Sequence, residues 1–360
     1  MDISALRAEF PVLARLAYLN AGTDGPLPAR AVAAAARELE REASDGRGRA
    51  HFERRSALGA ELRARYAGLL GCEPTDVALT SCTSEGIASV VAGLPLAPGE
   101  EILTSDEEHP GLLGALAAAR ELRGTAVREV PLARIAEEVT PRTRLVACAH
   151  VGWVSGSLAP AELADVEVPV LLDGAQGIGA IPLDVRELGC DAYEGAGQKW
   201  LCGPDGTGML YVSERLRERV EVDKRCYGNL ADANSGLDAH LHEDARRFDS
   251  PALGAEVLAC ALAAIEVLES VGWSEVFRRA RELAERLAGL LGERGRDVAP
   301  RAATTLVSFT SPDAEHELAQ LSENGIVVRN IPGRPWLRAS VGAWNHEDDL
   351  DRLLTTLSTG

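Results

Sequence analysis

Between residues 76 and 213, short apolar runs rich in Val, Ile and Leu alternate with stretches long enough to form helices. Continuous apolar runs separated by helical segments are typical of a mostly parallel sheet that is buried on both faces. The pattern therefore predicts a large α/β domain. The runs are DVALTS, EEILTS, RLVACAHV, VPVLLDGA, CDAYEGAG and GMLYVS, at residues 76–81, 100–105, 144–151, 168–175, 190–197 and 208–213.

Apolar positions with helical spacing lie on either side of this region. Residues 31–69 are rich in Ala and Arg, and a helix over residues 56–70 should end at Gly71, a residue type that favours helix C-termini. Two more helices are predicted over residues 255–272 and 273–295. The first group is expected to pack against the sheet, and the second to lead into a smaller C-terminal domain.

The remainder of the chain mixes strand, helix and loop signals. A final helix is predicted over residues 345–357, with Asn345 as its N-cap. Residues 227–248 are rich in Gly, Asn, Asp and His without periodicity, and loops of this length are usually functional or mobile. The strand candidates in this part are TTLVSFTS, GIVVRNI and LRASVGAW, at residues 304–311, 325–331 and 337–344.

The length of 360 residues exceeds what one ordinary core organises, which suits two domains. We expect a large α/β domain over residues 16–255 and a small α+β domain formed by residues 1–15 and 256–360. No apolar run reaches the roughly 20 residues that span a bilayer, and the N-terminus lacks the basic and apolar blocks of a secretory signal. These features predict a cytoplasmic protein without a membrane partner.

Charge and cysteine usage narrow the possible partners. The formal net charge of -18 would repel nucleic acid phosphates, so no nucleic acid partner is expected. The seven cysteines are dispersed without a Cys-x-x-Cys pair, which predicts reduced thiols rather than disulfides or a zinc site. His240 and His242 lack a third defined ligand in their polar loop, and no metal is assigned.

Two residues at the ends of predicted strands carry the chemistry. Asp173 ends the buried run VLLD, and Lys199 follows the next strand in GQKWLCGPDGTG, before a glycine-rich turn. A lysine so placed can form a Schiff base with an aldehyde, and an aspartate at a strand end can keep a pyridinium nitrogen protonated. The pair indicates a site for pyridoxal phosphate (PLP), although most lysines are solvated and an aspartate often caps a helix.

A turn between a strand and an apolar helix precedes both residues. The segment LTSCTSEG places Thr83 and Ser84 where free backbone N–H groups and the positive end of the helix dipole favour a phosphate. Taken alone, this segment reads as an ordinary Ser/Thr N-cap. Its position upstream of Asp173 and Lys199 makes it the candidate phosphate site.

The ordered motifs resemble those of class V aminotransferase-fold (fold type I) PLP enzymes, a group that holds cysteine desulfurases, cystine C-S lyases and isopenicillin N epimerase-like proteins. The resemblance spans Tyr18 to Leu354 and implies a PLP-dependent transferase-like large domain. It rests on the segments YLNAGTDGPLP, TSCTSEG, DEEHPG, AHVGWVSG, LLDGAQGIGA, GQKWLCGPDGTG and LRASVGAWNHEDDLDRL.

The resemblance implies roles for individual residues. Lys199 matches the Schiff-base lysine, Asp173 the partner of the pyridine nitrogen, and His109 the histidine stacked on the cofactor ring. Family members are usually homodimers with shared active sites, in which a hydroxyl residue reaches the partner's phosphate. Further cofactor contacts are implied for Thr83 and Ser84 at the phosphate, Gln176 at the phenolic oxygen, Gln198 where many members have His, and Ser250 as the shared hydroxyl.

Substrate contacts are implied in the same way. Arg338 matches the arginine that takes the substrate carboxylate, a task suited to the two parallel hydrogen bonds of a guanidinium. Asn20 and Trp153 complete the set, and Trp153 stands where desulfurases commonly have Asn. Desulfurases also carry a nucleophilic cysteine shortly before this arginine, but no cysteine occurs between Ala261 and Arg338.

These departures favour a C-S lyase that performs β-elimination on a cysteine- or cystine-type amino acid. Lys199 would remove the Cα proton, and a thiolate or persulfide would leave Cβ without help from an enzyme cysteine. The alternatives left open are an aminotransferase, an epimerase, a non-catalytic PLP-binding module, and a desulfurase that uses Cys82, Cys202 or Cys226.

Overall fold

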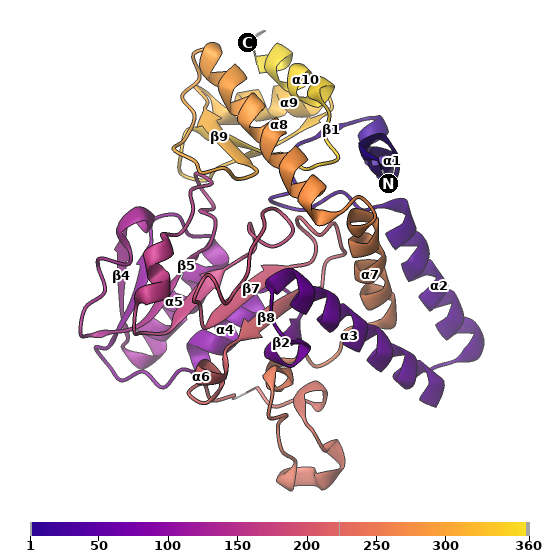
Figure 1. Ribbon diagram of the computed structural model, residues 1–360, viewed down its shortest axis with the longest axis vertical. Coiled ribbons are helices and arrows are strands. Elements are labelled where there is room, and N and C mark those ends of the chain that lie inside the picture. Colours follow the sequence, from indigo (N-terminus) through magenta and orange to yellow (C-terminus); the bar gives the residue numbers. More distant parts are fainter. Residues whose placement is uncertain (1, 223, 358–360) are drawn as a thin grey trace.

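A computed structural model describes residues 2–222 and 224–357, and its centre is a seven-stranded mixed sheet (Figure 1). The strand order is β2-β8-β7-β6-β5-β3-β4; pairs from β7 to β4 are parallel, whereas β8 runs antiparallel to β7 and β2. The predicted mostly parallel sheet is confirmed. Its strands are β2 (Val77–Thr80), β3 (Glu101–Ser105), β4 (Ala126–Val130), β5 (Thr143–Ala149), β6 (Val170–Asp173), β7 (Ala192–Ala196) and β8 (Gly208–Val212).

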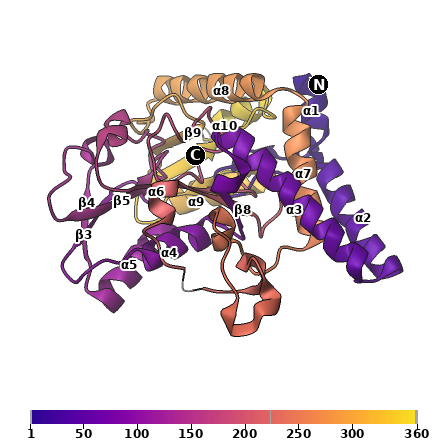
Figure 2. The ribbon, with the colours of Figure 1, turned by 60° about the horizontal axis from the view of Figure 1, so that its bottom comes forward.

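Helices cover both faces of this sheet. The face with Leu103 and Leu172 packs against α3 and α7, and the face with Ile102 and Leu171 packs against α4 and α5. Helix α2 lies along α7 (Figure 2). The helices are α1 (Ile3–Ala8), α2 (Ala29–Asp45), α3 (Arg49–Leu70), α4 (Thr83–Gly93), α5 (Pro110–Arg123), α6 (Glu214–Arg217), α7 (Ala255–Glu269), α8 (Trp273–Glu293), α9 (Ala314–Glu323) and α10 (Glu347–Leu357). None of those in the described part of the chain combines the length and apolarity that a bilayer crossing requires.

The C-terminal part holds a three-stranded antiparallel sheet of order β11-β12-β9, and β1 pairs in parallel with β10. Helices α8, α9 and α10 share a core with these strands. This is the expected small α+β unit, although the limits drawn at residues 15/16 and 255/256 stay predictions. The strands are β1 (Ala17–Tyr18), β9 (Leu306–Thr310), β10 (Ile326–Val327), β11 (Arg329–Asn330) and β12 (Trp336–Ser340).

The predicted N-cap role of Asn345 is wrong. Helix α10 begins at Glu347, and the Asn345 side chain accepts a hydrogen bond from the Gly342 N–H instead of from the helix. Its amide nitrogen donates to the carbonyl of Tyr18, so it fastens β1 to the turn after β12. The Asn345 side chain is fully buried and supplies the partner for the Gly342 N–H, whereas the helix start is served by Asp349, which accepts from the N–H of His346.

Residues 227–248 form the predicted loop and project away from the sheet (Figures 1 and 2). Only short 3₁₀ helices occur in this loop as the structure describes it, at Tyr227–Asn229, Ala233–Asp238 and Ala245–Phe248. The loop ends immediately before Ser250. Its course therefore decides where that residue lies.

Candidate active site

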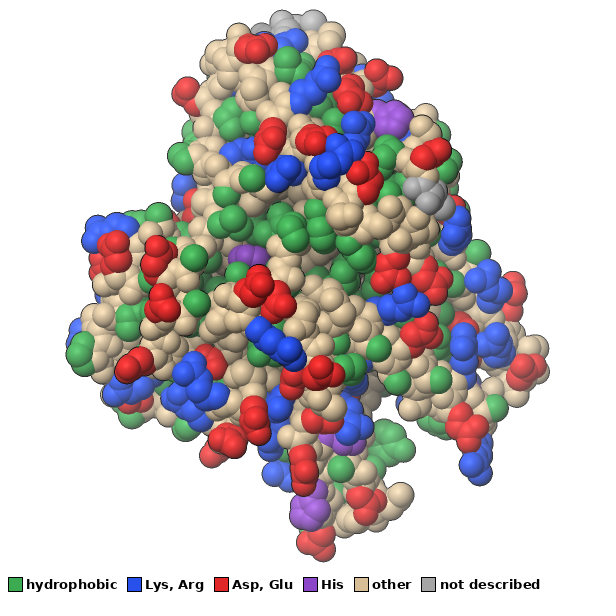
Figure 3. All heavy atoms as spheres, viewed as in Figure 1, with side chains coloured by type: hydrophobic (Ala, Val, Ile, Leu, Met, Phe, Trp, Pro, Cys, Tyr) green, Lys and Arg blue, Asp and Glu red, His purple; other side chains and the backbone are tan. Residues whose placement is uncertain are grey.

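A cavity of about 220 Å³ lies at the carboxyl ends of the central strands, beside the N-terminus of α4. In the space-filling view, apolar side chains gather in the hollow between the C-terminal unit, at the top, and the rest of the molecule (Figure 3). Open α/β sheets bind ligands at this edge. Seven of the predicted site residues line the cavity: Thr83, Ser84, His109, Trp153, Asp173, Gln198 and Lys199.

Lys199 and Asp173 face the same cavity. Burial lowers the pKa of Lys199 to about 8, while the nearby carboxylate of Asp173 opposes this effect. Burial raises the pKa of Asp173, and Lys199 in turn opposes that shift. Asp173 also accepts a hydrogen bond of 3.0 Å from the N–H of Ala175, which fixes the carboxylate at the strand end. A neutral amine is thus accessible near physiological pH beside a buried carboxyl group.

His109 is held in one orientation by the start of α5. Its Nδ1 accepts a hydrogen bond of 3.0 Å from the N–H of Gly111, and its ring meets Trp153 edge-on, with 5.3 Å between ring centroids. Burial, followed by the charges of Lys199 and Arg329, lowers the pKa of His109 to about 4. The imidazole is therefore neutral at physiological pH, with Nε2 as its remaining donor.

Arg338 is fully buried behind Trp153. One Nη donates to the Trp153 carbonyl at 2.5 Å, but its Nε and second Nη have no partner among the described residues. Burial, with a smaller effect from Arg329, lowers its pKa to about 9. A buried guanidinium with two unpaired donors favours an anion that can accept both, such as a carboxylate.

Arg329 lines the cavity although the motifs did not single it out. It pairs in register with Arg338 across β11 and β12, and the two guanidinium carbons lie 5.2 and 5.6 Å from the centre of the Trp153 ring. The available signal was a lone positive charge within the apolar run GIVVRNI. Its place beside Arg338 depends on strand register, which that run alone does not reveal.

Three further predicted residues lie next to the cavity without lining it. Arg338 lies behind the lining residue Trp153, to whose carbonyl it donates. Asn20 accepts a 2.8 Å hydrogen bond from Thr23, a lining residue. Gln176 is buried; its nitrogen donates to the carbonyl of the lining residue Gly22 at 2.7 Å, and its oxygen accepts from Trp200. The Gln176 amide is thus already paired within the chain.

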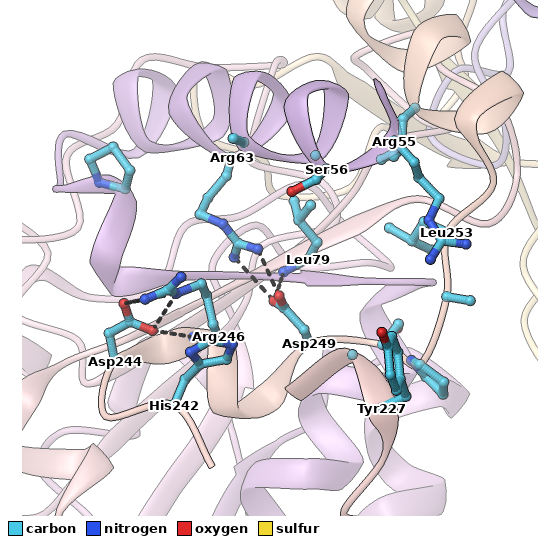
Figure 4. Close-up of a pocket in the computed structure, with 18 of the residues that line it drawn as sticks. Arg55, Ser56, Arg63, Leu79, Tyr227, His242, Asp244, Arg246, Asp249 and Leu253 are labelled. Carbon is cyan, nitrogen blue, oxygen red and sulfur yellow. Dashed lines mark hydrogen bonds and ion pairs between the residues drawn. The ribbon is translucent and has the colours of Figure 1, made fainter. Parts of the chain in front are cut away.

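Ser250 lies apart from these residues. It lines a different cavity, of about 670 Å³, between α3 and the end of the 227–248 loop. Figure 4 shows this cavity, in which Asp249 binds Arg63 and the N–H of Leu79. Although it is the larger of the two, it lacks the predicted lysine and aspartate, so we place the chemistry in the smaller one. The hydroxyl of Ser250 donates to Glu85.

A buried His150–Tyr193 pair supports the turn that carries Asp173. The His150 N–H donates to the Asp173 carbonyl at 2.9 Å, and its Nδ1 lies 3.0 Å from the Tyr193 hydroxyl. A Cβ added at Gly174 would lie 2.0 Å from the Tyr193 ring, and one at Gly177 would lie 2.2 Å from its hydroxyl. Both glycines are therefore required for this close packing.

The charge state of His150 should be visible in the stability of the protein. Burial lowers its pKa from 6.5 to about 4, so between these values the unfolded chain binds one more proton than the folded one. The free energy of unfolding should fall with falling pH by up to about 1.4 kcal/mol per pH unit from this group. The change His150→Gln should remove that slope in urea titrations between pH 5 and 6.5, whereas His240→Gln, in the exposed loop, should not. Equal slopes would contradict the assignment.

The structure contains neither disulfide bonds nor a metal-binding cluster among its described residues. All seven cysteines are free, and Cys82, the residue before α4, is the one that lines the cavity among the described residues. Within residues 2–222 and 224–357, no group of three or more His, Cys, Asp or Glu side chains could hold a metal ion.

The sequence and the fold of this chain are similar to those of known proteins. The isopenicillin N epimerase of Amycolatopsis lactamdurans is 30% identical over 94% of both chains, and a probable cysteine desulfurase of Methanothermobacter thermautotrophicus is 28% identical over 80% of this chain and 75% of its own. The solved structure of the cystine C-S lyase C-DES with its product, cysteine persulfide, is 29% identical with a TM-score of 0.91, covering 97% of this chain and 99% of that one. The family profile "Aminotransferase class-V" matches residues 17–353, so the chain belongs to the class V aminotransferase family.

Proposed function

We propose that this protein is a PLP-dependent C-S lyase that performs β-elimination on a cysteine- or cystine-type amino acid. One observation carries the proposal: Lys199 and Asp173 share a cavity whose Trp153 wall is backed by a buried arginine with two unpaired donors. The structural likeness to C-DES, described as a cystine C-S lyase, and to a C-DES mutant with glycine covalently linked to PLP, supports it.

The residues present fit the cofactor. The first turn of α4 offers free N–H groups and the hydroxyls of Thr83 and Ser84 to a phosphate, and Gln198, whose amide NH2 can donate, lines the same cavity. Lys199 supplies the amine for covalent attachment, and Asp173 supplies a buried carboxylate for the pyridine nitrogen. When bound, PLP supplies an electron sink for a negative charge at the substrate Cα.

The side chains then divide the work on the substrate. Arg338 takes the α-carboxylate with its two unpaired donors. Lys199, with its pKa near 8, accepts the Cα proton near neutral pH. Arg329 adds a second cation at the Trp153 wall, which suits a substrate with a second carboxylate, as cystine has.

An amino acid epimerase is the second candidate, because a relative described as an isopenicillin N epimerase is 30% identical over nearly the whole chain. Transamination would begin with the same steps and use the same residues for them. A desulfurase is less well supported. Cys82, the lining cysteine in the described chain, belongs to the turn that carries Thr83 and Ser84, not to the β12 side with Arg338.

We also propose a cytoplasmic homodimer with shared active sites. Seven free thiols suit a reducing compartment. Ser250, assigned by resemblance to a partner's phosphate, does not line the cavity of its own chain. The neighbouring loop exposes Tyr227 and Leu237, which are 73% and 105% exposed, and such side chains favour association.

The purified protein should convert cystine to pyruvate, ammonia and a persulfide without any keto acid. Because β-elimination needs no enzyme thiol, Cys82→Ser should change the rate of pyruvate release by no more than about threefold. Cys72→Ser, at a cysteine that lines neither cavity, is the control. Conversion of cysteine to alanine, with its sulfur left on the enzyme thiol as a persulfide, and loss of this activity in Cys82→Ser would instead indicate a desulfurase. Exchange of the Cα proton without pyruvate would indicate an epimerase, and cofactor binding without either would indicate a binding module.

A further inference from the structure

The carboxylate of Glu85 joins three segments that are distant in the sequence. One oxygen accepts hydrogen bonds of 2.7 Å from both the N–H and the hydroxyl of Ser81, and it also accepts from the hydroxyl of Ser250. The other oxygen forms an ion pair with Lys224. Burial raises the pKa of Glu85, but the bonds from Lys224, Ser250 and Ser81 outweigh it and hold the pKa at about 2.

Helix capping explains only part of this arrangement. Glu85 is the third residue of α4, where a glutamate commonly reaches back to the residues before the helix. That habit accounts for the contacts with Ser81. It does not account for Lys224 and Ser250, which precede and follow the 227–248 loop.

The loop is anchored unevenly, because Ala245 and Phe248 near its end are buried in the core that includes α4, whereas residues 230–241 are mostly exposed. Within the loop, Leu230 and Leu241 form an isolated bridge, and at its far end Asp249 binds Arg63 (Figure 4). Leu237 near its tip is fully exposed. The exposed stretch 230–241 has few buried contacts and opens at low free energetic cost, so the attachments on either side of it influence how often it opens.

We propose that Glu85 is a positioning residue that fastens both ends of the 227–248 loop to the phosphate-binding turn, so that cofactor binding and loop ordering stabilise each other. The inference rests on the proposed PLP site but goes beyond it. A phosphate at Thr83 and Ser84 orders the first turn of α4, and this turn carries Glu85. An ordered turn lowers the entropic cost of holding Lys224 and Ser250.

The positive charge of Lys224 should also affect phosphate binding. Glu85 is an anion one residue away from the proposed phosphate site, and like charges at that range repel each other. The ammonium group of Lys224 neutralises this carboxylate. Removing Lys224 should therefore release the loop and also weaken phosphate binding.

The test compares amide hydrogen exchange of residues 227–248, read by mass spectrometry, with the dissociation constant for PLP. In the unaltered protein, PLP should slow exchange in the loop. In Glu85→Gln, loop exchange without cofactor should accelerate about tenfold. The PLP dissociation constant should rise because the coupling between the two sites is reciprocal, but by less than this factor, because the unpaired Lys224 then attracts the phosphate. Lys224→Ala, a change at a half-exposed side chain, should act in the same direction without affecting folding.

Glu100→Gln is the matched control. Glu100 also accepts one backbone N–H, from Ala97, and one guanidinium, from Arg144, but it lies outside both cavities. This change should alter neither measurement. A Glu85→Gln protein with weaker PLP binding and unchanged loop exchange would reduce Glu85 to a helix cap and overturn the proposal. Failure of the unaltered protein to bind PLP would instead overturn the proposed function and the coupling with it.

Discussion

Replacing Lys199 by Ala should abolish turnover, with a loss of at least about 10⁴-fold, because the same amine attaches the cofactor and moves the Cα proton. The chain contains just two lysines, Lys199 and Lys224, which makes a sharp test possible. Borohydride reduction of the loaded protein should leave a stable label on the peptide containing Lys199 and none on the peptide containing Lys224.

Lys224→Arg is the matched control for this experiment, since it removes the other amine but keeps the positive charge beside Glu85. It should retain the label and the yellow colour of the bound cofactor. Label on Lys224, or turnover that persists in Lys199→Ala, would remove the basis of the proposed chemistry.

Replacing Arg338 by Gln should lower kcat/KM for the amino acid by about 10² to 10³-fold, within the 2–5 kcal/mol typical of a truncated buried charge pair. The PLP dissociation constant should stay nearly unchanged, because Arg338 lies behind Trp153 and not at the phosphate turn. Arg338→Lys should recover little, since an ammonium lacks the two parallel donors of a guanidinium.

Arg329→Gln separates the two arginines. Its effect should be small for an S-alkyl cysteine, which has one carboxylate, and larger for cystine, which has two. An equal loss with both substrates would mean that Arg329 supports Arg338 and does not read the second carboxylate. A parallel loss of PLP binding in Arg338→Gln would contradict its assignment to the substrate.

The sheet could be predicted from the sequence because central strands are buried on both faces and consist of continuous apolar runs. Strand β4 was not predicted, because an edge strand is less buried and lacks a continuous apolar run. Its sequence, AVREV, occupies the sheet edge, where only Val130 is buried. The predicted strand at residues 325–331 is two short strands, because β10 pairs with β1 whereas β11 pairs with β12. Pairing with a segment some 300 residues away leaves no local signal.

The site was predictable where a role follows from a local motif. Lys199, Asp173 and His109 each sit at a strand end or helix start that their neighbours in the sequence already indicate, and the structure brings them to one cavity. Arg329 could not be found in this way, since its position depends on the register of a hairpin. The bond between Ser250 and Glu85 likewise joins residues 165 positions apart.

The small unit is built from both ends of the chain: β1 pairs with β10, and Arg7 forms a 2.8 Å ion pair with Asp349. During synthesis, domains fold in the order in which they leave the ribosome. The lysine, the aspartate and the helix start at the phosphate turn are all translated more than a hundred residues before Arg338. A nascent chain can therefore assemble a cofactor cradle before its substrate recognition exists, and Arg338 is added only when β12 is translated.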